Sequence, residues 1–447
     1  MSRRPDIAVV GAGLAGCEAA LQLARRGFLV RLYEQKPQAR SEAASSDRFA
    51  ELVCSNSFRA RSLENAVGLV KEEMRRLGSF FMAAAARAEV PAGGAMAVDR
   101  ERFAAWMTEK VQAEPNVEIV SGVVDAVPEG DFETIVATGP LTGGRLADYL
   151  RELAGSGYGE LHFYDAIAPI VDAETIDMDK AFFASRYDKG GDDYLNLPLD
   201  EPTYRRFVDE LVRAERVLPR EFEDPKFFES CLPVDVLADR GPDTLAFGPM
   251  KPVGLVDPKT GKRPHAVVQL RREDKAGTAY NLVGFQTRLT YPDQKRIFRT
   301  IPGLEHAEFL RFGTVHRNTF LDAPRLLDRQ LRLRTNPRVL FAGQISGVEG
   351  YVESAACGLV VAILSAARLQ GAPIPPPPPE TMLGGMLNYL ATPQDRFQPS
   401  HVNHAMLPPP PGRKRGSERK LAYAERALAA LERWVLDNAI HVLEPEA

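Results

Sequence analysis

The chain has 447 residues, of which 45% are hydrophobic and 26% charged, as in an ordinary globular protein of two or three domains. A formal net charge of −4 gives no general attraction for nucleic acid, so any site for a polyanion must be a local patch. The four cysteines (Cys17, Cys54, Cys231 and Cys357) are too scattered for a disulfide framework, which favours a reducing cytoplasm. We expect neither a signal peptide nor a membrane span, because no suitable apolar run is apparent.

The first predicted unit is a βαβ motif over residues 6–34. A short apolar strand at 6–10 runs into a glycine-rich turn and a helix that ends at Gly27. A second apolar strand follows at 28–34. This order predicts two neighbouring parallel strands with a helix across one face.

Strand and helix patterns continue after this motif and return late in the chain. Helices are predicted at 65–79, 98–112 and 413–437, and strands at 132–140 and in the strand–loop–helix run 336–369. From about 160 to 330, short strand-like runs alternate with Gly/Pro turns, which indicates an inserted α+β domain. A stiff polyproline segment occupies 373–380. We therefore predict domain segments 1–160, 161–330 and 331–447, with the third completing the first.

The turn of the first motif is a dinucleotide fingerprint, Gly11-Ala12-Gly13-Leu14-Ala15-Gly16. Gly11 allows the tight turn, Gly13 lets the backbone approach a pyrophosphate, and Gly16 lets the helix pack closely on the strand. The helix start offers unpaired N–H groups to phosphate. Glu34, at the end of the second strand, is placed to hydrogen-bond a ribose.

Two later features favour FAD over NAD as the nucleotide. One is the strand that ends in Thr138 and Gly139, and the other is the loop 341–350 that leads into a long apolar helix. Within that loop we expect Gly343, Gln344 and Gly350 to approach the cofactor. The predicted fold class is therefore α/β, an FAD-binding Rossmann-like (doubly wound) domain with an inserted α+β domain. Since no second fingerprint follows a predicted strand, a nicotinamide reductant is expected to dock transiently.

The four cysteines and two charged segments remain to be assigned, either to packing and solvated surface or to a functional site. Cys17 and Cys357 lie on apolar helices and are expected to be packing residues, whereas Cys54 and Cys231 lie in polar surroundings, where a thiolate could act as a nucleophile. The charged run 271–275 is expected to be a solvated face. The start of the last predicted helix is basic and is either a phosphate-binding patch or a solvated helix. No metal site is predicted.

Several stretches between residue 7 and about residue 395 resemble the bacterial folate-dependent tRNA uracil-5 methyltransferases, the TrmFO family. The matching stretches are GAGLAGCEAA, DRFAELVCSNSF, VPAGGAMAVDR, GPMKPVGLVDPKTGK, VVQLRREDKAG, LVGFQT, HRNT and VEGYVESAACG. The second and fourth are specific to this family, whereas the glycine fingerprint is not.

The resemblance implies a cytoplasmic flavoprotein that makes 5-methyluridine in the T-loop of tRNA. The carbon would come from 5,10-methylenetetrahydrofolate, and the electrons from NADH or NADPH through FAD. Similar proteins implicate cysteines that match Cys54 and Cys231 in catalysis, and a histidine that matches His316 in packing on the folate. Neither a membrane nor an obligate protein partner is implied.

The chemistry explains why a thiolate is needed. Carbon 5 of uracil is a weak nucleophile until a thiolate adds to carbon 6. One thiolate suffices for this step, and the sequence leaves open how Cys54 and Cys231 divide the work.

Three other functions compete with this interpretation. The related GidA-type flavoproteins modify the wobble uridine of tRNA with a partner GTPase and are usually longer. A flavin reductase that does not act on nucleic acid would need neither Cys54 nor Cys231. An RNA-binding protein with a structural FAD would hold a flavin that a nicotinamide nucleotide does not reduce.

Overall fold

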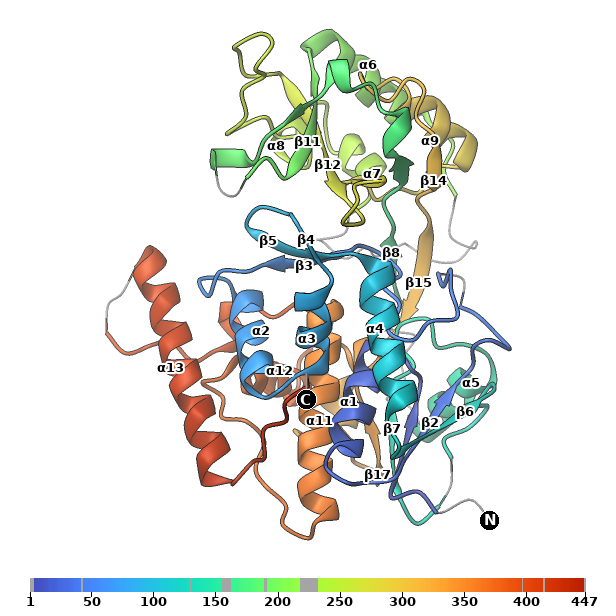
Figure 1. Ribbon diagram of the computed structural model, residues 1–447, viewed down its shortest axis with the longest axis vertical. Coiled ribbons are helices and arrows are strands. Elements are labelled where there is room, and N and C mark those ends of the chain that lie inside the picture. Colours follow the sequence, from blue (N-terminus) through green and yellow to red (C-terminus); the bar gives the residue numbers. More distant parts are fainter. Residues whose placement is uncertain are drawn as a thin grey trace.

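A mostly parallel sheet organises the larger body of the protein, which occupies the lower part of the computed structural model (Figure 1). The structure describes residues 4–445 except 42, 129, 155–161, 189–190, 218–231, 396 and 413–414. The strand order is β16-β17-β7-β1-β2-β6, and only the β16–β17 pair is antiparallel. The strands are β1 (Ile7–Val10), β2 (Val30–Glu34), β6 (Val117–Ser121), β7 (Glu133–Val136), β16 (Arg332–Leu333) and β17 (Asn336–Phe341).

Two apolar helices pack against each other beside this sheet. They are α1 (Leu14–Ala24), which starts at the fingerprint, and α11 (Tyr351–Leu369), which follows the late glycine loop. A Cβ on Gly358 of α11 would lie 2.2 Å from the carbonyl oxygen of Ala15, so the glycine permits a close helix–helix contact. By length and composition α11 could cross a membrane, which the sequence analysis overlooked, but 89% of its apolar window is buried inside the protein.

Further helices and a small sheet complete the larger body (Figure 1). The helices are α2 (Ala66–Arg76), α3 (Phe80–Arg87), α4 (Arg100–Ala113), α5 (Gly144–Ala154), α10 (Ala323–Leu326), α12 (Met382–Ala391) and α13 (Gly416–Asp437). The small sheet has the order β3-β5-β4, with β3 (Ser57–Ala60), β4 (Glu89–Val90) and β5 (Ala95–Val98). It lies on the side of the body that faces the inserted domain.

The inserted domain is built on an antiparallel sheet with the order β10-β11-β12-β13-β9-β14. Its strands are β9 (Ile170–Asp172), β10 (Phe182–Phe183), β11 (Tyr194–Leu199), β12 (Ala266–Arg272), β13 (Ala279–Leu282) and β14 (Phe309–Arg311). Its helices are α6 (Glu201–Arg213), α7 (Val234–Asp239), α8 (Thr244–Phe247) and α9 (Tyr291–Phe298). A hydrophobic core separate from that of the larger body lies between these elements.

A two-stranded antiparallel ribbon joins the bodies, formed by β8 (His162–Ala166) and β15 (Val315–Thr319) (Figure 1). The chain leaves and returns through this ribbon, so the upper domain is an insertion. Directly after it, Phe320 and Leu321 already pack in the core of the larger body.

Two local expectations need correction. The helix predicted at 65–79 is present as α2 but ends earlier, at Arg76, because Gly78 has φ +71° and the backbone of Leu443 occupies the position that a side chain would need. Ser79 then caps a new helix, α3, by accepting a hydrogen bond from the N–H of Met82. Strand β6 was not predicted, since its half-buried residues lack a clear alternation of apolar and polar positions.

Candidate cofactor and catalytic site

The fingerprint turn forms one wall of a cavity at the carboxyl ends of β1, β2 and β7. Gly11 has φ +99°, and a Cβ there would lie 2.6 Å from the carbonyl oxygen of Ala137. Gly16 packs on the turn so closely that a Cβ would lie 1.8 Å from the oxygen of Gly11. Ala12, Gly13, Leu14 and Ala15 line the cavity together with Gly11. Gly16 supports the wall without lining it.

The late glycine segment forms the opposite wall. Gly343, Gln344, Tyr351 and Ser354 line the same cavity. A Cβ on Gly343, which has φ +82°, would lie 2.9 Å from the Cβ of Ala15, so the two glycine segments touch although more than 300 residues separate them. The side chain of Gln344 donates a hydrogen bond to Glu349 (2.7 Å).

Of the other residues predicted to contact the cofactor, three line the cavity and one does not. Thr138 and Gly139 line the cavity where β7 ends. Glu34 also lines it, and its carboxylate accepts hydrogen bonds from the N–H groups of Ala12 (2.8 Å) and Lys36 (3.0 Å). Gly350 does not line the cavity, since it begins α11 at φ +106°, where a Cβ would contact Glu353 and His401.

The cavity has the features that a dinucleotide requires. A Cβ on Gly13 would meet no described atom closer than Ala137 O at 4.0 Å, so open space lies beside the start of α1. No side chain caps this helix, which leaves its first N–H groups for a phosphate. Glu34 retains acceptor capacity for a ribose hydroxyl. These residues therefore fit the pyrophosphate and ribose of FAD.

Cys54 lies in the loop before β3, next to this cavity. The Tyr351 hydroxyl accepts hydrogen bonds from the N–H groups of Cys54 (2.5 Å) and Ser55 (3.1 Å). Burial strongly raises the pKa of the Tyr351 phenol, and the nearby thiol of Cys54 raises it further, so the phenol stays protonated. Since Tyr351 also lines the cavity, one side chain links the cavity to the Cys54 loop.

Side chains on two elements hold this loop from the other side. Arg100, at the start of α4, donates hydrogen bonds to the carbonyl oxygens of Leu52 (2.8 Å) and Cys54 (2.9 Å), and forms an ion pair with Glu273 of the inserted domain. Burial alone would lower the pKa of Arg100, but Glu273 outweighs it and raises the pKa. Arg271 donates to the side chain of Ser55 (3.0 Å). The inserted domain thus helps to fix the position of Cys54.

The contacts of Arg271 and Glu273 with the larger body show that the expected solvated face at residues 271–275 is wrong. Arg271 and Glu273 are buried, with exposed fractions of 6% each. They alternate along the end of β12 and point at the larger body. The sequence analysis also missed Tyr351 and Arg100, although both lie inside stretches that carry the family resemblance. Arg271 and Glu273 are two residues apart, which places both side chains on the same face of a strand. This spacing was the pattern in the sequence that could have indicated a shared buried contact.

The structure places the remaining candidates as follows. Cys17 and Cys357 are fully buried, as expected of packing residues; burial strongly raises the pKa of Cys17, and it raises that of Cys357 to about 12. Cys231 lies outside the described residues. His316 is on β15, paired in register with Asp165, and its side chain is outside the described part. The catalytic role of Cys231 and the folate contact of His316 therefore stay predictions.

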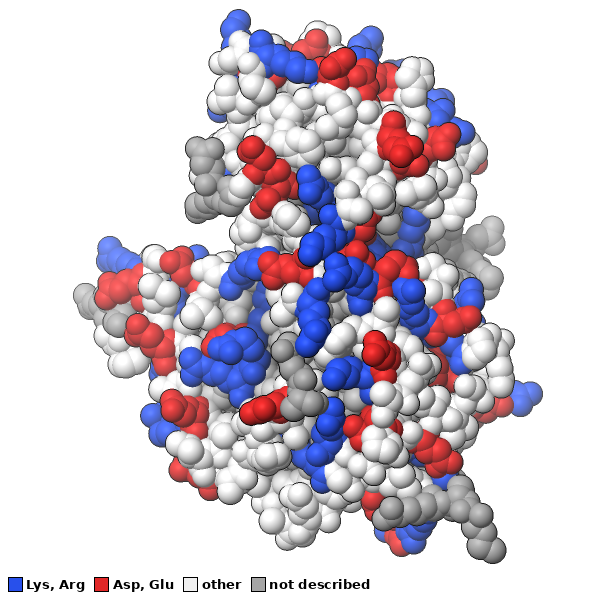
Figure 2. All heavy atoms as spheres, viewed as in Figure 1, with Lys and Arg blue, Asp and Glu red and all other residues white. Residues whose placement is uncertain are grey.

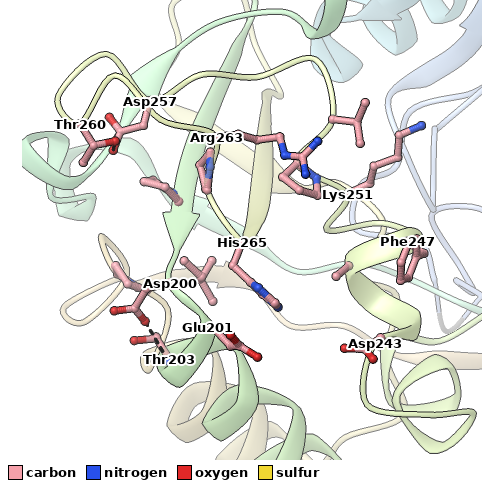
Figure 3. A pocket seen from close by; sticks show the side chains of 17 residues that line it. Asp200, Glu201, Thr203, Asp243, Phe247, Lys251, Asp257, Thr260, Arg263 and His265 are labelled. Carbon is pink, nitrogen blue, oxygen red and sulfur yellow. Dashed lines mark hydrogen bonds between the residues drawn. The ribbon is translucent and has the colours of Figure 1, made fainter.

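A second cavity lies in the inserted domain between the start of α6, α8 and the loop before β12 (Figure 3). Carboxylates of Asp200, Glu201 and Asp243 lie on one side, and Lys251 and Arg263 on the other. These mixed charges favour no single kind of ligand, and none of the predicted site residues whose side chains the structure describes lines this cavity. Within the described residues, no cluster of His, Cys, Asp and Glu could hold a metal ion.

Basic side chains gather along the junction between the two bodies, with acidic ones among them (Figure 2). Exposed basic residues on elements near this junction include Arg61, Arg87, Arg102 and Lys275. The basic start of α13 is also exposed at Arg415, Arg419 and Lys420, and Arg419 lies over the ring of Tyr423. Arg413 and Lys414 are outside the described residues. Phosphate binding by this tail stays a prediction.

Comparisons with known proteins agree with this architecture. The family described as glucose inhibited division protein A (GidA) matches residues 6–373. The solved structure of Aquifex aeolicus GidA superposes with a TM-score of 0.71 at 18% identity, covering 99% of this chain and 75% of that chain. Fold and cavity therefore define an FAD-binding Rossmann-type protein of the GidA type, and the predicted fold class is confirmed.

The curated relatives give the particular family. A protein of Citrifermentans bemidjiense is 54% identical over 96% of this chain and 98% of its own length, and one of Myxococcus xanthus is 54% identical over 97% and 95%. Both are named methylenetetrahydrofolate–tRNA-(uracil-5-)-methyltransferase TrmFO. This chain belongs to the TrmFO family, which confirms the resemblance in its sequence.

Proposed function

We propose that this protein methylates carbon 5 of a uridine in the T-loop of tRNA, with 5,10-methylenetetrahydrofolate as the carbon donor and FAD as the reducing cofactor. The observation that carries the proposal is the position of Cys54. The loop of the family-specific stretch is fixed beside the dinucleotide cavity through Tyr351, and a thiolate there can act on a uracil that enters next to the cofactor.

The thiolate of Cys54 adds to carbon 6 of uracil, and the electron pair of the double bond moves to carbon 5. Carbon 5 then bonds to the folate-borne carbon as one of the two carbon–nitrogen bonds that hold this carbon breaks. A base, for which Cys231 is the candidate, takes the proton from carbon 5, and the second carbon–nitrogen bond breaks. Tetrahydrofolate leaves, and an exocyclic methylene remains on a ring that still carries the thiol at carbon 6. FAD, when bound and reduced, would supply the hydride that converts this methylene to methyl, and the thiolate would leave carbon 6 in that step.

The other residues position these reactants. Gly13 and the start of α1 hold the pyrophosphate, and Glu34 holds a ribose. Thr138, Gly139, Gly343 and Gln344 approach the rest of the cofactor. His316 packs on the folate, and NADH or NADPH docks transiently as the source of electrons. We place the reaction in the cytoplasm, where tRNA, folate and nicotinamide nucleotides are present, without a membrane or an obligate protein partner.

Mass analysis of tRNA tests the proposal. The purified protein is incubated with an unmodified tRNA transcript, methylenetetrahydrofolate and NADPH, and the nucleosides of the T-loop and of the wobble position are then analysed separately. We expect one 5-methyluridine in the T-loop and an unchanged wobble uridine. Modification at the wobble position would favour the GidA-type activity, and oxidation of NADPH without any change in the tRNA would favour a flavin reductase.

A further inference from the structure

Three aromatic rings stack on the side of the inserted domain next to the connecting ribbon. The rings of Tyr291 and Phe312 are nearly parallel, with an interplanar angle of 17° and centroids 4.9 Å apart. Those of Phe312 and Phe309 are equally parallel, at 16° and 5.2 Å. Other aromatic contacts of this domain are tilted or edge-to-face, as in the Phe285–Phe298 pair. We call Tyr291, Phe312 and Phe309 the aromatic ladder.

The ladder runs from the core of the domain to solvent. Its inner end, Phe309, contacts the fully buried Phe298, which belongs to the core. Its outer end is Tyr291, which is 53% exposed and, among the residues that the structure describes, makes no ring contact other than that with Phe312. Tyr291 is not among the residues of the domain's hydrophobic core. An exposed ring at the end of a parallel stack offers a flat surface for another ring.

A residue in the same segment as the ladder contacts the rim of the cofactor cavity. Arg311 lies between Phe309 and Phe312, and its guanidinium donates a hydrogen bond to the carbonyl oxygen of Ala43 (3.3 Å), beside the cavity-lining Ala44. Burial lowers the pKa of Arg311, as does the charge of Arg100, and Arg311 also interacts electrostatically with Tyr351 and Cys54. The segment that carries two rings of the ladder therefore also contacts the rim of the cofactor cavity.

The charge beside the ladder suits a polyanion. Lys295 lies one helical turn after Tyr291 on α9, is exposed and forms no ion pair within the described residues. The nearest carboxylate on the same helix, Asp293, is already paired with Arg296. A flat aromatic surface next to an unpaired cation is the combination that binds single-stranded nucleic acid, with stacking for the base and a cation for the phosphate.

We propose that the aromatic ladder is a stacking platform for an unpaired base of the RNA substrate, with Tyr291 stacking on the base and Lys295 contacting a neighbouring phosphate. The inference rests on the proposed function, which makes tRNA the substrate. It adds a second contact outside the catalytic cavity, one that recognises a base turned out of its helix and not a base pair.

Binding of a fluorescent RNA hairpin that carries the T-arm sequence tests this role, with the full-length FAD-bound protein. Tyr291→Ala removes the ring, Tyr291→Leu keeps apolar bulk without a flat face, and Tyr291→Trp enlarges the face. Phe247→Ala is the matched control, because Phe247 is an exposed aromatic residue of the same domain at the rim of the second cavity (Figure 3). The rate at which NADPH bleaches the flavin without RNA is measured in each variant.

We expect Tyr291→Ala and Tyr291→Leu to raise the Kd of the hairpin by about five- to 150-fold, the range for loss of one stacked base. Tyr291→Trp and Phe247→Ala should keep the wild-type Kd or improve it, and all variants should keep the flavin-bleaching rate. Lys295→Ala should reduce the slope of log Kd against log salt by about 0.7 to 0.9, as for one lost phosphate contact.

Wild-type Kd in Tyr291→Leu would overturn the stacking role. An equal loss of affinity for a fully paired RNA duplex would overturn it too, since a duplex offers no unstacked base. Failure of the proposed function would look different, because the wild-type protein itself would then form no 5-methyluridine in the T-loop.

Discussion

The backbone of Cys54 is held at both of its polar groups, by Tyr351 at the N–H and by Arg100 at the carbonyl oxygen. Replacement of Cys54 by alanine removes only the thiol and leaves the backbone contacts with Tyr351 and Arg100 in place. The side chain can therefore be removed without releasing the loop, which makes Cys54 well suited to a test of chemistry separate from structure.

We predict that Cys54→Ala retains FAD and normal reduction of the flavin by NADPH but loses formation of 5-methyluridine. Hydride transfer to a flavin requires no thiol, whereas activation of uracil does. Stopped-flow bleaching of the flavin and tritium release from carbon-5-labelled uridine measure the two steps. Cys17→Ala and Cys357→Ala are the controls; both should methylate, with a stability loss of about 1 kcal/mol from truncation in the core. Full methylation by Cys54→Ala would refute its role.

A second residue-scale prediction concerns pH. Burial alone would raise the pKa of Glu353, but the guanidinium of Arg59 and the nearby imidazole of His401 (Nδ1–Oε1 3.7 Å) outweigh it and lower the pKa to about 2. The ionised form is therefore favoured in the folded state and contributes on the order of 3 kcal/mol above pH 4.5, which is lost as the pH falls from about 4.5 towards 2.

Glu353→Gln should accordingly be much less stable than the wild type at pH 7, and the difference should shrink below pH 4.5. Urea unfolding at pH 7, 5, 4 and 3 measures it. The matched control is Glu89→Gln, whose partner Arg61 is at the surface, where an ion pair contributes less than about 1 kcal/mol. A difference that stays constant across this pH range would contradict the assignment.

Individual residues were predictable where the geometry is local. Gly11, Gly13 and Glu34 could be assigned because one turn and one strand end fix their positions. The hydrogen bond between Tyr351 and Cys54 joins residues 297 apart in sequence, and no local pattern indicates it.

At the scale of elements, α4 and β12 are coupled through the ion pair of Arg100 and Glu273. Both side chains are largely buried, with exposed fractions of 14% and 7%. Removal of Arg100 leaves a buried carboxylate without its partner and should cost about 3–5 kcal/mol. It also frees the carbonyl oxygens of Leu52 and Cys54.

We therefore predict that Arg100→Ala retains FAD but lowers the rate of methylation more than the rate of flavin reduction. A double-mutant cycle with Glu273→Gln measures the coupling by urea unfolding. The exposed pair of Arg61 and Glu89 provides the control cycle, for which less than about 1 kcal/mol is expected. Equal coupling energies in the two cycles would show that Arg100 and Glu273 do not form a buried clamp.

The βαβ unit and the return of the chain at 336–369 were predictable, since both follow from short-range apolar patterns and glycine turns. The strand order of the inserted sheet was not. Strands β9 and β14 pair across more than 130 residues, and β14 is only three residues long. Such pairing depends on the packed core and not on local periodicity.

At the scale of the whole molecule, the two largest hydrophobic cores of the described residues are separate, and the dinucleotide cavity belongs to one of them. A ligand stabilises only the unit whose folded state binds it, by about 2.7 kcal/mol at a free concentration one hundred times its Kd. We predict two calorimetric transitions, of which added FAD shifts only one to higher temperature. The Gly13→Val variant, which fills the open space at the pyrophosphate, should show no shift. A single transition that moves as a whole would contradict the independence of the two cores.

The contact between Gly343 and Ala15 also determines when, during synthesis of the chain, the cofactor can bind. Both walls of the cavity are needed to enclose the cofactor, and the second wall is made only after the ribosome has passed residue 354. The inserted domain, complete in sequence before that point, can fold first. Cofactor loading is therefore a late step in biogenesis, and a nascent chain stalled before residue 340 should bind no flavin.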